Sequence, residues 1–218
     1  MTRSLVVLLA LTALTLVVFA LWPGIDLAVS HYFYDRGGFV GHDGLERFGR
    51  DFFRVTPYAV LIGFAILYAL RWFGVAVPYA PTGRALVFLA ATMAIGPGLI
   101  VNVGLKDHSH RPRPVHVQEF GGSDEFRPWY RFDGACQKNC AFASGEAAQS
   151  FWMVAPASLA PPQARPLAIG AALLFGVAAS VLRLAFGGHF LSDVLLGGLI
   201  SLIVIVIARQ LIWPRGAP

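Results

Sequence analysis

The stretch "NVGLKDHSHRPRPVHV", Asn102–Val117, marks where a long apolar run ends and a polar loop begins. Within it, six basic or imidazole side chains follow one another closely: Lys106, His108, His110, Arg111, Arg113 and His116. The apolar run before it is long enough to cross a bilayer as a helix. The cluster is therefore expected at a membrane surface, and its chemistry needs an explanation.

The composition predicts an integral membrane protein. Of 218 residues, 56% are hydrophobic and only 13% are charged, whereas soluble domains carry about 25% charged residues. We predict an all-α, polytopic fold with six transmembrane helices. These are expected at 4–22, 57–73, 84–105, 144–160, 166–186 and 192–213. The 144–160 span is the weakest, because Glu146 and Gln149 lie in its first turns.

The N-terminal run is read as a retained span. It begins after Arg3 and reaches Trp22, and "FALWPG" is a poor signal-peptide cleavage site. Residues 1–55 are then an N-terminal transmembrane helix followed by a periplasmic connector, whose segment "DGLERFGRDFFRV" at 43–55 has an amphipathic pattern. Residues 56–218 are expected to form the core of the protein, with five transmembrane helices.

Six spans place both termini on one side of the membrane. The short loops on that side carry arginines without acidic residues, which makes this side cytoplasmic by the positive-inside rule. The arginines at this side are Arg3, Arg71, Arg84, Arg165, Arg209 and Arg215. Loops 23–56 and 106–143 are then periplasmic, as in a bacterial inner-membrane protein. The basic cluster at 106–116 therefore lies on the side that the rule does not explain.

The formal net charge of +5 does not indicate a nucleic-acid partner, because the basic residues lie at span ends and in loops. Snorkelling side chains explain most of them. The sharper alternative is an anionic substrate, and the motifs decide between the two. The membrane is an expected partner, and a nucleic acid is not.

Three polar islands occur at the same predicted membrane face. They are the cluster at 106–114, "FASGEAAQS" at 142–150 and "RLAFGGHFLSD" at 183–193. Ionisable residues at membrane depth are costly and are candidates for function. Lys106, Arg113 and Arg183 are cations that match phosphate oxygens. Ser144 and Gly145 precede a predicted helix, where free N–H groups favour an anion.

His189 and Asp193 are four residues apart. On a helical turn this spacing lets the carboxylate accept a hydrogen bond from one imidazole nitrogen, which leaves the other nitrogen as a nucleophile. Each feature alone has a plainer reading: a membrane anchor, a helix N-cap or a structural His–Asp pair. Together they favour a phosphate-processing site.

These residues resemble the type 2 phosphatidic acid phosphatase superfamily, which shares a helical core with vanadium haloperoxidases. Lys106 and Arg113-Pro114 match its K-x6-R-P motif. Arg183, His189 and Asp193 match S-R-x5-H-x3-D, with Leu182 in place of the serine. The P-S-G-H motif appears as the tetrapeptide Ala143-Ser144-Gly145-Glu146. The resemblance covers residues 56–213.

The resemblance implies hydrolysis through a phosphohistidine without a metal or other cofactor. His189 would attack phosphorus and Asp193 would orient it, while five residues would hold the phosphoryl oxygens: Lys106, Arg113, Ser144, Gly145 and Arg183. Glu146 replaces the histidine that protonates the leaving oxygen in the family. A carboxyl group near the membrane surface can have a raised pKa and serve as that acid. The plainer alternative is that Glu146 caps its helix or pairs with an arginine.

The only two cysteines, Cys136 and Cys140, lie in the loop predicted to be periplasmic. An oxidising compartment favours a local disulfide. A zinc site with His108, His110 or His116 is the alternative, although C-x3-C is not a zinc-finger spacing.

The sequence thus predicts a metal-independent phosphatase that cleaves a phosphate monoester or diphosphate from a lipid at the periplasmic face. Candidate substrates implied by the family are lipid A, undecaprenyl diphosphate, phosphatidylglycerol phosphate and phosphatidic acid. Two alternatives stay open: a lipid phosphotransferase that uses the same site, and a non-enzymatic membrane protein that binds or transports an anion.

Overall fold

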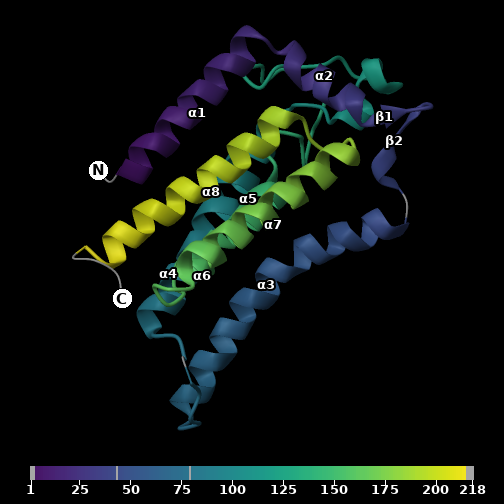
Figure 1. Cartoon of the computed structure of the whole chain (residues 1–218). Coiled ribbons are helices and arrows are strands. Elements are labelled where there is room, and N and C mark those ends of the chain that lie inside the picture. The colour runs from purple at the N-terminus through teal and green to yellow at the C-terminus, as the bar shows by residue number, and fades with distance from the viewer. Residues whose placement is uncertain (1–2, 43, 79, 215–218) are drawn as a thin grey trace.

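The computed structural model describes residues 3–42, 44–78 and 80–214, and most of them are helical. The helices run roughly alongside one another, and the longer loops gather at one end of the bundle (Figure 1). In chain order the elements are α1 Arg3–Leu21, α2 Gly24–Tyr32, β1 Tyr34–Asp35, β2 Gly38–Phe39, η1 Val40–His42, α3 Gly44–Trp72, α4 Gly83–Met93, η2 Ala94–Lys106, η3 Pro114–His116, η4 Gln118–Phe120, α5 Gly145–Phe151, α6 Val154–Ala157, α7 Arg165–Ala185 and α8 Leu191–Ile212.

Within the described residues, five helices are long and apolar enough to cross a membrane. They cover Arg3–Leu21, Arg47–Trp72, Gly83–Lys106, Arg165–Ala185 and Leu191–Ile212. The predicted helical membrane protein is therefore confirmed, but the predicted count of six spanning helices is not.

The difference lies in the segment predicted as a span at 144–160. It forms two short helices, α5 with 7 residues and α6 with 4, separated at Trp152 and Met153. Ala147, Ala148 and Ala155 in these helices have no exposed surface. The segment is thus enclosed by other helices, and α5 packs against both α7 and α8. A segment shielded from lipid does not need an uninterrupted helix.

The third predicted span is a helix that widens without breaking. α4 continues directly into η2, a π-helical segment that contains Pro97. The Asn102 side chain donates a hydrogen bond of 2.8 Å to the Pro97 carbonyl oxygen. The wider turns thus accommodate the proline within a continuous helix.

The predicted amphipathic connector and second span form one helix. α3 runs for 29 residues from Gly44 to Trp72 and passes through Pro57. No helix end marks the domain boundary predicted at residue 55, which stays a prediction. Asp43 and the side chains of Leu45 and Glu46 lie outside the described part of this segment.

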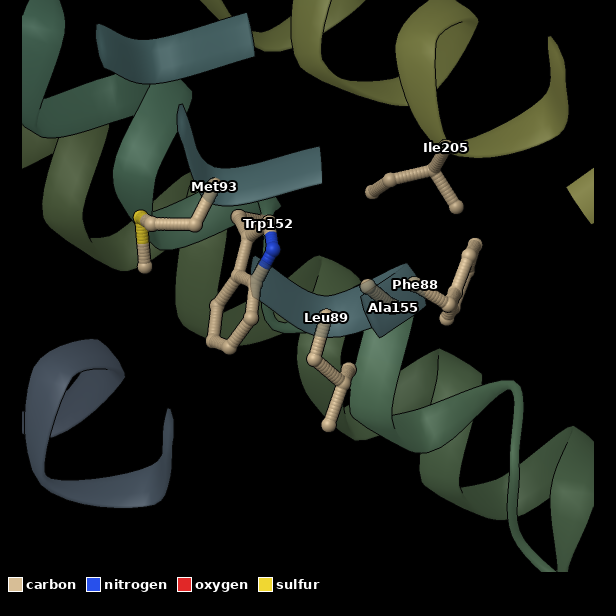
Figure 2. Packing of buried hydrophobic residues seen from close by; sticks show 6 residues of the cluster. All are labelled: Phe88, Leu89, Met93, Trp152, Ala155 and Ile205. Carbon is tan, nitrogen blue, oxygen red and sulfur yellow. The ribbon is translucent and has the colours of Figure 1, made fainter. Parts of the chain in front are cut away.

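The largest buried hydrophobic cluster joins α4, α5–α6 and α8 (Figure 2). Its centre is Trp152, which has no exposed surface and whose Nε1 donates to Thr92 Oγ1 at 2.9 Å. Phe88, Leu89, Met93, Ala155 and Ile205 complete the cluster. The indole therefore joins the break between α5 and α6 to α4 while its polar atom stays satisfied.

The outer helices leave apolar surface uncovered. α1 buries only Leu5 and Phe19 among its described residues, and on α3 Ile62 and Ile66 are more than half exposed. Exposed apolar side chains along helices of this length fit a lipid environment. α1 lies along α8, and α2 contacts the beginning of α8.

Candidate active site

The three polar islands meet at the loop-bearing end of the bundle. The Ser144 N–H donates to the Asp193 carbonyl oxygen at 3.0 Å, and the Val115 N–H donates to the Gly187 carbonyl oxygen at 3.0 Å. The first contact joins the start of α5 to the start of α8. The second joins the basic cluster to the turn between α7 and α8. The fold therefore assembles at one place the motifs that are far apart in the sequence.

His189 lies in this turn and is 1% exposed. Its Nδ1 lies 2.7 Å from the carbonyl oxygen of Ala141. Because a carbonyl oxygen only accepts, Nδ1 must carry the proton, and Nε2 holds the free electron pair of the neutral ring. Burial and the nearby Arg183, Lys106 and Arg113 hold the pKa of His189 well below its usual value. The imidazole is thus neutral and equipped as a nucleophile through Nε2.

Asp193 is placed differently from the expectation. Its Oδ2 is 3.8 Å from His189 Nδ1, too far for a hydrogen bond. That oxygen instead accepts from the Phe190 N–H at 2.7 Å. The hydrogen bond that fixes the tautomer therefore goes to the Ala141 carbonyl group. Asp193 thus lies near the ring and binds the backbone next to it.

Glu146, the residue in place of the family's histidine, is bound by two arginines. Its Oε1 is 2.9 Å from Arg50 Nη2, and its Oε2 accepts from Arg50 Nε at 3.3 Å. The Arg183 Nε lies 3.5 Å from Oε2, which is an ion pair and not a hydrogen bond. Two cations favour the ionised carboxylate in the free enzyme. The structure thus shows the alternative in which Glu146 pairs with a nearby arginine. To serve as the expected general acid, Glu146 would first have to gain a proton.

Ser144 and Gly145 begin α5, as predicted. The Ser144 hydroxyl accepts from the Ala147 N–H at 3.3 Å, so it caps the helix. A Cβ atom on Gly145 would lie 2.3 Å from Asn102 Oδ1. A larger residue at this position would have to displace the Asn102 side chain of η2, the segment that carries Lys106 at its end.

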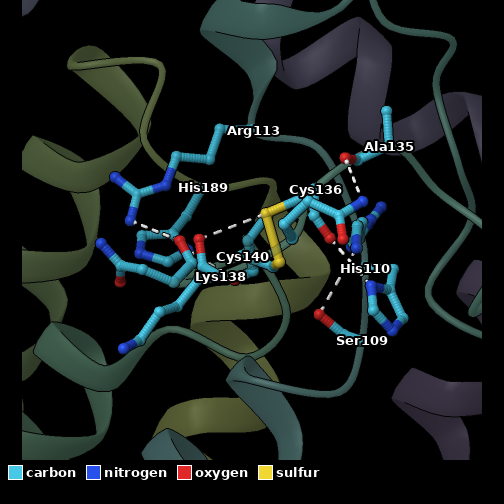
Figure 3. Close-up of a disulfide and its surroundings, with 12 residues drawn as sticks. Ser109, His110, Arg113, Ala135, Cys136, Lys138, Cys140 and His189 are labelled. Atoms are coloured by element: carbon cyan, nitrogen blue, oxygen red, sulfur yellow. Dashed lines mark hydrogen bonds between the residues drawn. A yellow bond between two sulfur atoms is a disulfide. The ribbon is translucent and has the colours of Figure 1, made fainter.

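A disulfide between Cys136 and Cys140 closes the loop beside the histidine (Figure 3). Arg113 Nη2 donates to the Asn139 carbonyl oxygen at 2.9 Å, and the Cys140 N–H donates to the Lys106 carbonyl oxygen at 3.3 Å. Both sulfurs are bonded to each other, so no thiolate remains for the alternative zinc site. Among the residues described, no group of three or more His, Cys, Asp or Glu side chains is arranged for a metal ion.

Sequence reasoning missed three site residues. Arg50 was assigned only to an amphipathic surface, whereas its side chain reaches Glu146. Arg111 was noted as part of the basic cluster without a role, and it pairs with both Asp193 and Asp26. Asp26 had one available signal, since it is an isolated acid in the apolar stretch "GIDLAVS".

The chain matches proteins of known kind over most of its length. The model for the PAP2 superfamily matches residues 85–217. A lipid A 4'-phosphatase of Francisella tularensis subsp. novicida is 34% identical over 187 residues, which cover 83% of each chain. A lipid A 4'-phosphatase of Rhizobium leguminosarum is 34% identical over 206 residues, covering 87% of this chain and 88% of the relative. No solved structure matches the chain.

Proposed function

Because this phosphatase chain belongs to the PAP2 superfamily, we propose that it is a lipid phosphatase that hydrolyses the 4'-phosphate of lipid A in the bacterial inner membrane. One observation carries the proposal: a buried, neutral His189 is surrounded by the motif cations. The names of the relatives supply the substrate, which composition and motifs leave open.

In the proposed reaction, Nε2 of His189 attacks phosphorus while the bond to the lipid oxygen breaks. Lys106, Arg113 and Arg183 neutralise the charge on the phosphoryl oxygens, and Ser144 and Gly145 complete their binding site. The leaving oxygen takes up one proton. Water then attacks the phosphohistidine, which releases phosphate and restores the neutral imidazole.

Glu146 is the proposed proton donor, but its carboxylate must first be protonated. In the free enzyme its carboxylate binds Arg50 and is close to Arg183. An arriving phosphate competes for these cations and brings negative charge, and both effects favour protonation of the carboxylate. Glu146 therefore gains its proton when the substrate is bound.

We further propose that the site faces the periplasm and that the chain crosses the membrane six times. The α5–α6 segment begins at Ser144 beside Asp193 and ends at Ser158, whose oxygens accept from Arg209 near the end of α8. The α5–α6 segment therefore runs from the beginning of α8 to near its end, which supports a sixth crossing of the membrane inside the helix bundle. The arginines of the opposite end support a cytoplasmic location for both termini. A haloperoxidase-like core is part of the same proposal, on the motif resemblance.

The test is phosphate release by purified protein from a panel of lipid phosphates that includes lipid A. We expect His189→Ala to abolish release, and His116→Ala, a change at an exposed histidine, to preserve it. Trapping of acid-labile, base-stable phosphate on wild-type protein but not on His189→Ala would identify the intermediate. Wild-type rates in His189→Ala would sink the mechanism, and release only with a second lipid acceptor would favour a phosphotransferase.

A second measurement addresses the metal-independent character of the reaction. Vanadate, which adopts the geometry of pentavalent phosphorus, should inhibit competitively, because protein cations bind the phosphoryl oxygens. EDTA should leave the rate unchanged. Loss of activity in EDTA that added Mg²⁺ or Zn²⁺ restores would contradict this part of the proposal.

A further inference from the structure

A fully enclosed ion cluster lies behind the proposed nucleophile. Arg111 Nη2 is 2.7 Å from Asp26 Oδ2, and Arg111 Nη1 is 2.5 Å from Asp193 Oδ1. The exposed fractions of Arg111, Asp26 and Asp193 are 0%, 1% and 0%. An uncompensated charge at such a place costs several kcal/mol. Each member therefore depends on the others to stay in position.

Further hydrogen bonds fix the geometry of the cluster. Ser192, which precedes Asp193, donates its N–H to Asp26 Oδ1 at 2.9 Å and its hydroxyl to Asp26 Oδ2 at 2.6 Å. The same hydroxyl accepts from Arg111 Nη1 at 2.9 Å. The guanidinium carbon also lies 4.4 Å from the ring centre of Phe190. The planar guanidinium group of Arg111 thus has little freedom to rotate.

Arg111 contacts both groups that hold the imidazole of His189. Its side chain binds Asp193, whose other oxygen accepts from the N–H of Phe190, the residue after His189. Its backbone carbonyl oxygen accepts from the Ala141 N–H at 2.9 Å. The Ala141 carbonyl oxygen in turn accepts from His189 Nδ1. A shift of Arg111 would therefore move both supports of the ring.

We propose that Asp26 and Arg111 are positioning residues, which lock Asp193 and the Ala141 carbonyl group so that Nε2 of His189 is aimed at phosphorus. The inference rests on the proposed role of His189 as nucleophile. Asp26 lies on α2, outside the residues 85–217 that the family model matches. The N-terminal part of the chain therefore completes the site in addition to anchoring it.

The first test is Asp26→Asn, which replaces one acceptor oxygen by a donor group facing Arg111 and Ser192. Because misplacement of about 1 Å costs about 100-fold in rate, we expect kcat to fall 10- to 100-fold while KM stays within about twofold. Single-turnover trapping should show the same loss in phosphohistidine formation. The matched control is Ser30→Ala, because Ser30 is equally buried on α2 and its hydroxyl has no hydrogen-bond partner among the residues described.

The second test separates a positioning role from a merely structural one. If Asp26 acts through Asp193, its loss should matter little once Asp193 is changed, because the effects of coupled residues are not additive. The double variant with Asp26→Asn and Asp193→Asn should therefore have a kcat less than about threefold below that of Asp193→Asn alone. Losses that multiply, or a wild-type kcat in Asp26→Asn, would overturn the proposal. Should Asp26→Asn fail to fold, Ser192→Ala removes only the bridging hydroxyl and allows the same comparison, with the same two outcomes.

The His189→Ala protein keeps the two proposals distinguishable. If it is inactive while Asp26→Asn has the wild-type kcat, only the positioning role is wrong. If His189→Ala itself retains turnover, the nucleophile is wrong and the positioning role is overturned with it.

Discussion

Glu146 is one of the residues at which this chain departs from the family motifs, and its contacts give a specific expectation. Glu146→Gln keeps the size of the side chain but cannot supply a proton. If Glu146 protonates the leaving oxygen, the rate on an alkyl phosphate should fall about 10²- to 10⁴-fold. An aryl phosphate, whose nitrophenolate leaves without a proton, should be affected far less.

The control for this experiment is Arg50→Gln, which removes the bidentate partner of Glu146 but leaves the carboxyl group. Because the carboxyl group can still take up and donate a proton, this variant should show no selective loss on the alkyl phosphate. Equal losses on alkyl and aryl phosphates in Glu146→Gln would assign to Glu146 only the role of orienting Arg50 and Arg183. Glu146→His should retain partial activity with a shifted pH optimum.

The charge state of His189 gives a prediction about pH. Burial and the cations of Arg183 and Lys106 lower the pKa of His189, so the ring binds a proton only at a pH well below about 6.5. As the pH falls from 7 to 6, the nucleophile should therefore stay neutral. NMR of protein with labelled histidine should show this, with His189→Gln assigning the signal. A ring of His189 that is half protonated at pH 6.5 or above would contradict the site geometry.

At the level of single residues, motif spacing predicts a set of cations and a histidine that the fold brings together, but it does not predict the groups that support them. The Ala141 carbonyl group holds the ring of His189. Every residue has a backbone carbonyl group, so a sequence motif cannot predict which of them accepts this hydrogen bond. Asp26 and Arg111 are 85 positions apart in the sequence. Only the folded chain shows that they form one pair.

At the level of elements, hydropathy predicted the long helices well because each must match the thickness of a membrane. It did not predict the break between α5 and α6 within 144–160, where enclosure by α7 and α8 removes that requirement. It also divided α3 into a connector and a span. Polarity changes along this helix while the helix itself continues. Helix continuity depends on backbone hydrogen bonds, which a hydropathy profile does not measure.

The loop closed by Cys136 and Cys140 is an element with its own testable role. It presents the Asn139 carbonyl group to Arg113 and leads directly to Ala141, which holds His189. Loss of hydrogen bonds worth about 1 kcal/mol should slow the reaction roughly 5- to 10-fold. We therefore expect this reduction in kcat/KM when both cysteines are changed to serine. An unchanged kcat/KM in the double variant would show that the loop holds its shape without the disulfide.

Treatment of the wild-type protein with a reductant should reproduce the effect of the double cysteine variant. The same reductant should have no effect on the variant itself, since the described structure contains no free cysteine and the chain has only these two. A reductant effect that persists in the variant would assign the loss to another cause.

At the level of the whole molecule, the outward apolar surface and the candidate site belong to different helices. α1 and α3 present apolar surface outward, while α5 and the beginning of α8 are enclosed and carry Ser144 and Asp193. Each outer helix nevertheless has a polar link to the interior. Arg50 on α3 reaches Glu146, and Trp129 in the loop donates to the Leu16 carbonyl oxygen of α1 at 3.2 Å. The N-terminal helices are therefore joined to the site by specific polar contacts.

Orientation in the membrane is the last property to test, and it decides which leaflet supplies the substrate. Arg71, Arg84, Arg165 and Arg209 lie at or near the helix ends opposite the site, and a cytoplasmic excess of arginine sets the orientation of such proteins. Arg215 adds to the count in the sequence but lies outside the described residues.

A reporter fused after Pro218 should therefore be cytoplasmic, and one inserted in the loop at 106–143 should be periplasmic. A further reporter at the N-terminus should agree with the one after Pro218 if the chain crosses the membrane six times, whereas five crossings would place these two reporters on opposite sides. A cytoplasmic signal from the 106–143 loop would put the site at the inner leaflet and contradict the proposed periplasmic hydrolysis.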